Sequence, residues 1–450
     1  MASSSSSLPL LTLFLLSTLL YTTSGTGTTS TGSDACSTSP DTGSTLRIIH
    51  AFGPCSPLRP AVPFPSWADF LTDQTERDTT RLLFLNSLAT TGTGKSFVPV
   101  ASGKQLLQIP NYIVRGRLGT PSQNLLLAFD TSNDAAWMPC TGCTGCPAGS
   151  TWFNPTTSTS YRPVPCGSPQ CSQAPSPTCY PRANSCSFNF SYAASSFEAG
   201  LGQDSLSLAS DTVSSYTFGC LQKVVGNSIP PQGLLGLGRG PLSFLTQSKS
   251  IYGSTFSYCL PSFKSLNFSG TLRLGTYGQP KRIKSTPLLL NPHRSSLYYV
   301  KMTGIKVGRR TVAIPPSSLA FDTTTGAGTV IDSGTMFTQL VRPAYEAMRL
   351  EFRRQVNAPV TSLGGFDTCY NGPVKYPAIT LLFQGMQVTL PEDNVMIHST
   401  AGTISCLAMA AAPEGVNAVL NVIANMQQQN HRILFDVPNS RVGFARELCT

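Results

Sequence analysis

Charged side chains are scarce in this chain of 450 residues: they make up 12% of it, against about 25% in a typical globular protein. Long apolar stretches are also lacking. Beyond residue 25 we expect no membrane span and no lipid anchor, because no segment reaches ~18 apolar residues and no apolar tail follows. No basic run is interleaved with aromatic residues, which argues against a nucleic-acid-binding protein. Ser, Thr, Gly and Pro replace the missing charges, and this composition favours short strands joined by turns.

The first 25 residues are predicted to be a signal peptide. Leu8 to Tyr21 is almost wholly apolar, is too short to span a membrane, and is followed by small residues that suit cleavage. The Ser-rich start carries no positive charge, so a plastid transit peptide is the competing interpretation. Such peptides usually contain Arg and lack a compact apolar block. We therefore expect a secreted, extracellular protein.

Two similar phrases, far apart in the sequence, each place an aspartate at the end of an apolar run. The first ends in Asp130 and the second in Asp332. A carboxylate at the end of a buried strand is costly unless it is paired or hydrogen-bonded, so two such sites indicate a shared polar centre. If the two acids face each other, like-charge repulsion makes the pair hold one proton. One carboxylate can then activate a water while its protonated partner polarises a carbonyl group.

These phrases resemble those of pepsin-like aspartic proteases of the plant nucellin and nepenthesin type. The chain is especially similar to secreted, apoplastic members associated with plant systemic immunity. The cysteines and the closing phrase Val442-Gly443-Phe444-Ala445 also match the family. The resemblance implies an all-β, bilobal pepsin-like fold with few short helices, in which each lobe supplies one catalytic aspartate.

The second phrase has the complete pattern of the family. By this resemblance Ser333 can hydrogen-bond across to the other loop, Gly334 permits a tight backbone, and Thr335 can donate to Asp332. The resemblance therefore implies Asp332 as one member of the catalytic pair.

The first phrase departs from the family pattern. Thr131 fits, but Ser132 stands in place of the usual Gly, and Asn133 stands in place of the usual Ser. The backbone N–H of Ser132 remains a donor to Asp130, while Asn133 must supply by its amide what a hydroxyl normally gives. We expect the enzyme to be active but slower or more selective than one with Gly at this position.

Two aromatic residues are expected at the substrate cleft by the same resemblance. Tyr192 corresponds to the tyrosine of the flap, a hairpin that closes over substrate, and Trp137 packs beside the catalytic loop. The residues after Tyr192 are Ala-Ala-Ser-Ser instead of the glycine-containing phrase common in the family, which should restrict the hairpin tip. Two glycosylation sequons begin at Asn189 and Asn267, and the first lies beside the predicted flap.

The chain contains 14 cysteines, an even number, and half of them lie between residues 140 and 186. The first three of these have the spacing Cys-x-x-Cys-x-x-Cys, which can hold a metal ion or an iron–sulfur cluster in a reducing compartment. Behind a secretion signal, disulfides are the better interpretation, although spacing does not reveal their pairing. With Cys36 and Cys55 set aside, twelve cysteines are predicted to form disulfides: Cys140, Cys143, Cys146, Cys166, Cys171, Cys179, Cys186, Cys220, Cys259, Cys369, Cys406 and Cys449.

The predicted organisation follows the family. Residues 26–96 resemble a prosegment that covers the cleft until its removal near Ser96–Val100, although a small independent domain is the alternative. Within it, residues 67–88 are predicted to be helical. Residues 97–290 are expected to form an N-terminal β lobe with the Cys-rich insertion and the flap, and residues 291–450 a C-terminal β lobe.

The predicted function is a monomeric aspartic endopeptidase that acts on polypeptides at acid pH, without a metal or other cofactor and without a nucleic-acid or membrane partner. The alternative is a catalytically weak or silent protein that binds and inhibits another protein, as plant xylanase-inhibitor relatives do. The net charge of +10 suggests association with acidic cell-wall polysaccharide, although a solvated surface with scattered Lys and Arg explains it more simply.

Overall fold

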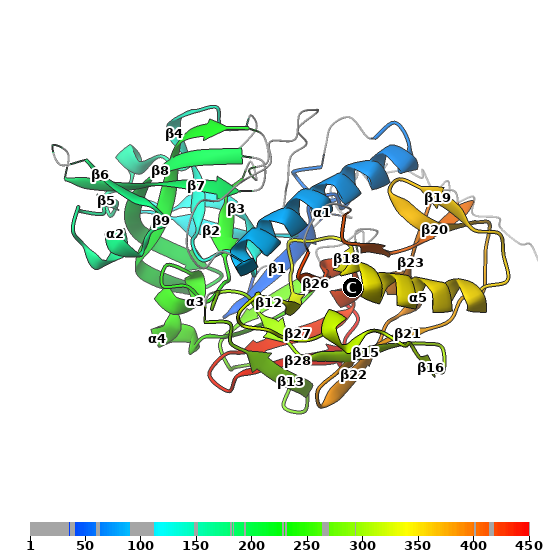
Figure 1. Ribbon diagram of the computed structural model, residues 1–450. Coiled ribbons are helices and arrows are strands. Elements are labelled where there is room, and N and C mark those ends of the chain that lie inside the picture. The colour runs from blue at the N-terminus through cyan, green and yellow to red at the C-terminus, as the bar shows by residue number, and fades with distance from the viewer. Residues whose placement is uncertain are drawn as a thin grey trace, which may run out of the picture.

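The structure is a computed structural model of the chain (Figure 1). The predicted signal peptide, the predicted cleavage region near residues 96–100 and Asn267 lie outside the residues that it describes. Within its longest helix, the side chains of residues 87, 88 and 90 are also outside the description. The described residues are 36, 41–59, 64–90, 112–147, 152–180, 182, 184–192, 195–226, 229, 232–262, 270–292, 294–399, 402–413 and 418–449.

The fold is built of strands in two lobes, as the sequence predicts, and Figure 1 shows them as a cyan-to-green half and a yellow-to-red half. The N-terminal lobe contains β2 (Tyr112–Leu118), β3 (Gln123–Asp130), β4 (Trp137–Thr144), β5 (Arg162–Pro163), β6 (Pro177–Tyr180), β7 (Ser185–Tyr192), β8 (Ser195–Leu208), β9 (Asp211–Val225), β10 (Leu234–Gly236), α2 (Pro169–Gln173), α3 (Phe244–Gln247) and α4 (Lys249–Tyr252).

The C-terminal lobe repeats this strand-rich architecture around one longer helix, α5. Its elements are β14 (Tyr299–Val300), β15 (Met302–Val307), β16 (Arg310–Thr311), β17 (Gly328–Ile331), β18 (Thr338–Leu340), α5 (Arg342–Gln355), β19 (Thr361–Leu363), β20 (Phe366–Asn371), β21 (Ile379–Phe383), β22 (Met386–Thr389), α6 (Glu392–Val395), β23 (Met396–His398), β24 (Ile404–Leu407), β25 (Met409–Ala411), β26 (Leu420–Ile423) and α7 (Asn425–Gln428).

A continuous antiparallel sheet joins the two lobes. Its strands pair in the order β1, β12, β11, β27, β28, β13, so segments from the start, the middle and the end of the chain lie side by side. Buried and half-buried side chains alternate along β12, which places one face of this sheet in the core. The strands are β1 (Thr45–His50), β11 (Thr255–Cys259), β12 (Gly270–Leu274), β13 (Lys284–Leu289), β27 (His431–Asp436) and β28 (Arg441–Arg446).

Each catalytic phrase lies where a buried strand ends beside a parallel neighbour. In the N-terminal lobe β10 runs parallel to β3, and Gly236 is opposite Asp130. In the C-terminal lobe β26 runs parallel to β17, and Ile423 is opposite Ile331. Gly236 is required here, because a Cβ at this position would lie 2.5 Å from the carbonyl oxygen of Ala135. The close crossing of strands thus holds each aspartate at a strand end inside the core.

The longest helix, α1 (Trp67–Thr90), lies across the molecule (Figure 1). Its Arg81 bonds to Asp130 and Asp332. Leu71 near its start packs with Phe366 of the C-terminal lobe, and Leu85 near its end packs with Leu420. The helix predicted over residues 67–88 is therefore confirmed and ends two residues later. No helix among the described residues has the length and apolar character needed to span a bilayer.

All fourteen cysteines form disulfides. Cys36 pairs with Cys55, which are the two cysteines of the predicted prosegment. Their sequence separation of 19 residues closes a loop that contains β1. The other pairs are Cys140–Cys220, Cys143–Cys146, Cys166–Cys179, Cys171–Cys186, Cys259–Cys449 and Cys369–Cys406.

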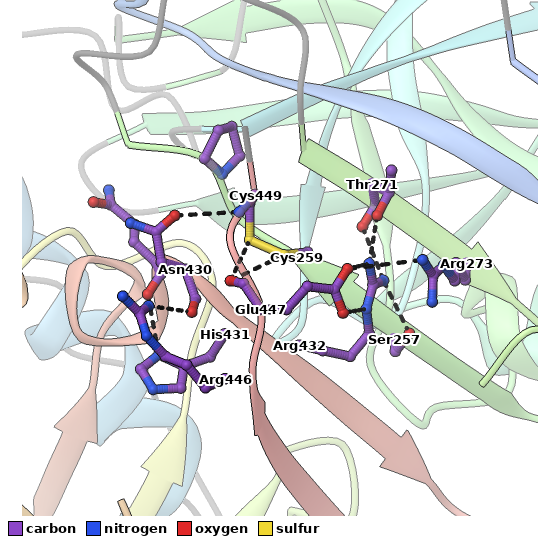
Figure 2. Close-up of a disulfide and its surroundings, with 12 residues drawn as sticks. Ser257, Cys259, Thr271, Arg273, Asn430, His431, Arg432, Arg446, Glu447 and Cys449 are labelled. Atoms are coloured by element: carbon purple, nitrogen blue, oxygen red, sulfur yellow. Dashed lines mark hydrogen bonds and ion pairs between the residues drawn. A yellow bond between two sulfur atoms is a disulfide. The ribbon is translucent and has the colours of Figure 1, made fainter. Parts of the chain in front are cut away.

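The disulfide between Cys259 and Cys449 ties the end of the chain to the shared sheet (Figure 2). Beside it, Glu447 accepts hydrogen bonds from the buried Arg432 at 2.9 and 2.5 Å. These bonds, followed by the charges of Arg432 and Arg273, hold the pKa of Glu447 below its usual value against partial burial. The bridge ties the segment after β28 to β11, and the ion pair ties it to β27.

Removal of this bridge should lower stability markedly. Its partners are 190 residues apart in the sequence, so the unfolded chain without the bridge has much more conformational entropy. The double variant Cys259→Ser, Cys449→Ser should therefore lose about 2–5 kcal/mol of unfolding free energy. Cys143→Ser with Cys146→Ser is the matched control, because those cysteines are only 3 residues apart and close almost no loop. Denaturant unfolding of the two double variants measures the difference. Equal losses would contradict this expectation.

Candidate active site

The two aspartates meet at the centre of the molecule, as the sequence predicts. Asp130 is 0% and Asp332 1% exposed. Their loops are joined by reciprocal hydrogen bonds: the Thr131 N–H donates to Ser333 Oγ at 3.2 Å, and the Ser333 N–H donates to Thr131 Oγ1 at 3.0 Å. The expected bond from Ser333 across to the other loop is therefore present, with Ser333 as the acceptor. These bonds fix the two catalytic loops relative to each other.

The hydrogen bonds around Asp130 follow the unusual residues of its phrase. Oδ1 accepts from the Ser132 N–H at 2.8 Å and from Ser132 Oγ at 2.9 Å, while Oδ2 accepts from the Asn133 side-chain amide at 2.7 Å. The backbone donor at Ser132 is thus retained, and Asn133 supplies a donor through its amide as expected. On the other side Thr335 Oγ1 donates to Asp332 Oδ2 at 2.6 Å. Asp130 receives more local donors than Asp332.

The guanidinium of Arg81, from helix α1, lies between the two carboxylates. Its Nη2 lies 2.7 Å from Asp130 Oδ1, 2.8 Å from Asp332 Oδ1 and 2.8 Å from Ser132 Oγ. Its Nη1 donates to Asp130 Oδ2 at 2.9 Å, and its Nε donates to Asp332 Oδ2 at 3.0 Å. Arg81 therefore fills the space between the two carboxylates and bonds to both.

Opposing effects act on the ionisation of Asp130. Burial favours the neutral acid, but the charge of Arg81 and the hydrogen bonds from Arg81, Ser132 and Asn133 outweigh it, so the pKa of Asp130 lies below its usual value. The pKa of Arg81 is raised: burial disfavours its charge, but Asp130 and Asp332 stabilise it more strongly. In this structure a charged Arg81 is thus paired with an ionised Asp130.

Sequence reasoning did not identify Arg81. The predicted helix contains several apolar residues next to it, and an arginine among them has the pattern of an ordinary solvent-facing residue. The sequence signal is that Arg81 directly precedes the apolar Leu82. The structure shows that Leu82 is fully buried. Recognition of its role requires the tertiary position of α1.

Polar anchors hold α1 in this position. Both carboxylate oxygens of Asp78 accept backbone N–H groups of the C-terminal lobe, from Met336 at 2.8 Å and Phe337 at 2.6 Å. One turn after Arg81, the side-chain oxygen of Asn86 accepts the Val419 N–H at 3.0 Å. The helix is therefore held by specific hydrogen bonds on both sides of Arg81.

The flap tyrosine lies over the acids, as expected from the resemblance. Tyr192 ends β7, is buried, and its hydroxyl lies 3.3 Å from Asp130 Oδ2 and 3.1 Å from Arg81 Nη1. Its ring meets that of Trp137 edge to face, with centroids 5.6 Å apart. On its other side Phe84 of α1 packs at 5.7 Å. The hairpin tip, residues 193–194, lies outside the described residues.

A cavity of 190 Å³ lies beside the loop that follows Asp130, with Ser132 and Asn133 in its wall. Phe84 lines it together with Trp137, Phe190 and Leu242, while Arg294 is on its polar side. Phe84 thus reaches a mainly apolar hollow beside the loop that follows Asp130. Trp137 lines this hollow, and Tyr192 packs against both Phe84 and Trp137.

The structure also bears on the cysteine cluster and one sequon. The three cysteines of the Cys-x-x-Cys-x-x-Cys phrase are all engaged in disulfides, which removes the metal or iron–sulfur alternative. Across the parts of the chain that the structure describes, no group of His, Cys, Asp or Glu is arranged to hold a metal ion.

Asn189 has an exposed side chain on β7, so its sequon is accessible.

Comparison with known proteins connects this geometry to a family. Residues 112–276 match the family described as xylanase inhibitor N-terminal, and residues 297–446 match the one described as xylanase inhibitor C-terminal. Among solved structures, basic 7S globulin from soybean has a TM-score of 0.60 at 23% identity, covering 74% of this chain and 92% of that one. The structure of edgp has a TM-score of 0.61 at 21% identity, covering 79% and 97%. These likenesses show the fold.

Sequence relatives identify the family. The chain is 50% identical to aspartyl protease AED3 of Arabidopsis thaliana, over 97% of this chain and 98% of that protein. It is 49% identical to aspartyl protease 25 of Oryza sativa subsp. japonica, over 90% and 94%. It is 35% identical to aspartic proteinase nepenthesin-1 of Nepenthes gracilis, over 75% and 78%. The chain therefore belongs to the plant pepsin-like aspartic protease family.

Proposed function

We propose that this protein is an aspartic endopeptidase that hydrolyses peptide bonds at acid pH with Asp130 and Asp332. The observation that supports this most strongly is the contact of one polar atom, Arg81 Nη2, with an oxygen of each buried carboxylate at 2.7 and 2.8 Å. A water at that position can hydrogen-bond to both acids at once. General acid–base catalysis requires this reach of about 2.6–3.2 Å.

The unequal hydrogen bonding suggests the role of each acid. Asp130 receives donors from Ser132 and Asn133, which favour its ionised form, so it serves as the base that removes a proton from the water. Asp332 then carries the shared proton and donates it to the carbonyl oxygen of the substrate. The water oxygen adds to the carbonyl carbon. Collapse of the tetrahedral intermediate breaks the C–N bond: the proton held by Asp130 passes to the leaving amine, and Asp332 takes back a proton from one hydroxyl of the intermediate, which restores the pair with its single shared proton.

We further propose that residues 26–96 are a prosegment that keeps the enzyme inactive. Arg81 and Phe84 of α1 take the places of the water and of a substrate side chain. Chain cleavage between Thr90 and Tyr112, for which a point near residues 96–100 is our expectation, would allow the helix to leave. The two lobes, 97–290 and 291–450, would form the mature enzyme.

Acid should weaken the attachment of this helix. Pairing with Arg81 depresses the pKa of Asp130, so its contribution to docking is present at pH values above the pKa of the free acid. It is lost as the pH falls through the lower pKa of the docked form, because the acid is then protonated. Low pH would therefore both release the helix and supply the single proton that the mechanism needs.

A second candidate function is inhibition of another protein through the same fold. The description of the matching families as xylanase inhibitor is the observation that favours it. Against it, both acids are present here, buried and hydrogen-bonded in the arrangement that the chemistry needs. The enzyme is the better-supported function.

Secretion and cell-wall association belong to the same proposal. Seven disulfides suit an oxidising extracellular compartment better than a plastid. The exposed cations Lys281, Arg282 and Lys284 lie close together in the sequence and suit an acidic polysaccharide. An accessible Asn189 would carry a glycan in that compartment. We propose a glycosylated monomer in the apoplast.

The proposed activity is tested with the folded chain after removal of the prosegment. At acid pH it should cleave a mixture of denatured proteins, and a peptide containing statine, which mimics the tetrahedral transition state, should stop the cleavage. A folded, processed chain that leaves every protein intact but inhibits another enzyme would favour the second candidate function instead.

A further inference from the structure

We propose that Ser132, which stands where the family has Gly, is a third catalytic residue: its hydroxyl holds the attacking water together with the two aspartates. This inference rests on the proposed function. Three side-chain oxygens lie within 2.8 Å of Arg81 Nη2: Asp130 Oδ1, Asp332 Oδ1 and Ser132 Oγ. A water that replaces Nη2 has the same three neighbours.

The hydrogen-bonding capacity of a water fits these neighbours. The water donates one hydrogen to ionised Asp130 and the other to Ser132 Oγ, which here accepts a hydrogen from Arg81. It accepts one hydrogen bond from protonated Asp332. One lone pair remains free to attack the carbonyl carbon. Ser132 thus aims the water, while proton transfer takes place between the water and Asp130 as before.

The backbone accommodates this side chain. Ser132 does not have a positive φ, so its backbone is not in the left-handed region, where a side chain would be strained. The corresponding place in the other phrase, Gly334, differs. A Cβ there would lie 2.4 Å from the Arg81 guanidinium, in the space of the reacting group. A hydroxyl can therefore approach the water from the Asp130 side, whereas a side chain at residue 334 would displace it.

The same hydroxyl also acts on Asp130. It lies 2.9 Å from Oδ1 and donates to it, which stabilises the carboxylate. In the processed chain the other groups that face Asp130 are Asn133, the Tyr192 hydroxyl and Asp332. Loss of the Ser132 hydroxyl should therefore make Asp130 easier to protonate. With the hydroxyl in place Asp130 is the weaker base, which agrees with the slower enzyme that the sequence leads us to expect.

The test compares two peptide inhibitors on the processed chain. One contains statine, whose hydroxyl takes the place of the water, and the other is the same peptide without that hydroxyl. The ratio of their dissociation constants measures the contacts of the hydroxyl alone. In Ser132→Ala and Ser132→Gly this ratio should fall about fivefold, the effect of one net hydrogen bond. In both variants the acid limb of kcat/KM should also move up by roughly half a pH unit or more.

Each outcome has a distinct meaning. A parent enzyme that binds neither inhibitor and cleaves nothing would contradict the proposed function. A parent that cleaves peptides and prefers the hydroxyl inhibitor, with the same ratio and the same acid limb in both Ser132 variants, would overturn this inference alone. Thermal unfolding of the variants checks that they fold. Agreement between Ala and Gly assigns the effect to the hydroxyl, because only Ala keeps the Cβ.

Discussion

Replacement of Arg81 by methionine is expected to release the unprocessed chain from inhibition. The guanidinium is 7% exposed and pairs with both acids, so its loss leaves two buried carboxylates under the helix without their cation. Breaking a buried charge network of this kind costs about 3–5 kcal/mol. The fraction of chains with an open site should rise roughly 10²- to 10⁴-fold. Cleavage of a fluorogenic peptide by the unprocessed chain, at a pH where the parent is silent, measures this gain.

Arg77→Met is the matched control for this experiment. Arg77 is on the same helix, one turn earlier, and pairs with Asp73 of the same helix at 2.6 Å rather than with the catalytic acids. Its replacement should leave the unprocessed chain silent. If both variants became active to the same degree, α1 would inhibit by covering the cleft as a whole and not through the charge of Arg81. An Arg81→Met chain that is folded, unprocessed and still silent would contradict the role assigned to Arg81.

Replacement of either aspartate by asparagine is expected to lower kcat of the processed chain by at least about 10³-fold, because an amide neither accepts the proton of the water nor donates one to the carbonyl. The change is nearly isosteric, so the fold should persist. The two effects should also be far from additive, since Asp130 and Asp332 act as one unit. Initial rates for Asp130→Asn, Asp332→Asn and the double variant measure both points.

Asp367→Asn serves as the control for a lost carboxylate. Asp367 is on β20 and pairs with Arg349 at 2.5 Å and with Arg353 at 3.3 Å, both on α5. Its replacement should affect stability and leave kcat within about twofold of the parent. An Asp332→Asn chain with a rate like that of Asp367→Asn would show that the acids are not the catalytic pair.

The meeting of the two aspartates could be predicted from the sequence because its signals are local. Asp130 and Asp332 each follow an apolar run, and the residues after them supply donors within three positions. The bilobal fold followed from the resemblance together with the strand-rich composition. Helix α1 was predictable from its apolar residues near Trp67 and Leu85. In each case the information is contained in a short stretch of chain.

Arg81 and the disulfide pairs could not be predicted in this way. The role of Arg81 depends on where α1 docks, which is set by contacts between Asp78 and the backbone of Met336 and Phe337 in another part of the chain. Cysteine spacing does not determine pairing, so the disulfide between Cys36 and Cys55 could be assigned only from the structure. Long-range contacts of this kind leave no local pattern.

The substitution at Ser132 illustrates an intermediate case. From sequence, the residue could be recognised as unusual, and its backbone donor to Asp130 could be expected. The direction of its hydroxyl could not be predicted, because it depends on how the two acids are arranged in space. In the structure the hydroxyl faces Arg81, which lies between them. A departure from a pattern thus indicated where to look, and the tertiary structure supplied the chemistry.

The most direct test of a shared-proton pair is the pH dependence of kcat/KM for one peptide, measured on the processed chain. A water-activating pair with a single proton predicts a bell-shaped profile centred at acid pH, because the rate falls both when the pair takes up a second proton and when it loses the first. A profile that keeps rising to neutral pH, or that does not change with pH, would contradict the mechanism.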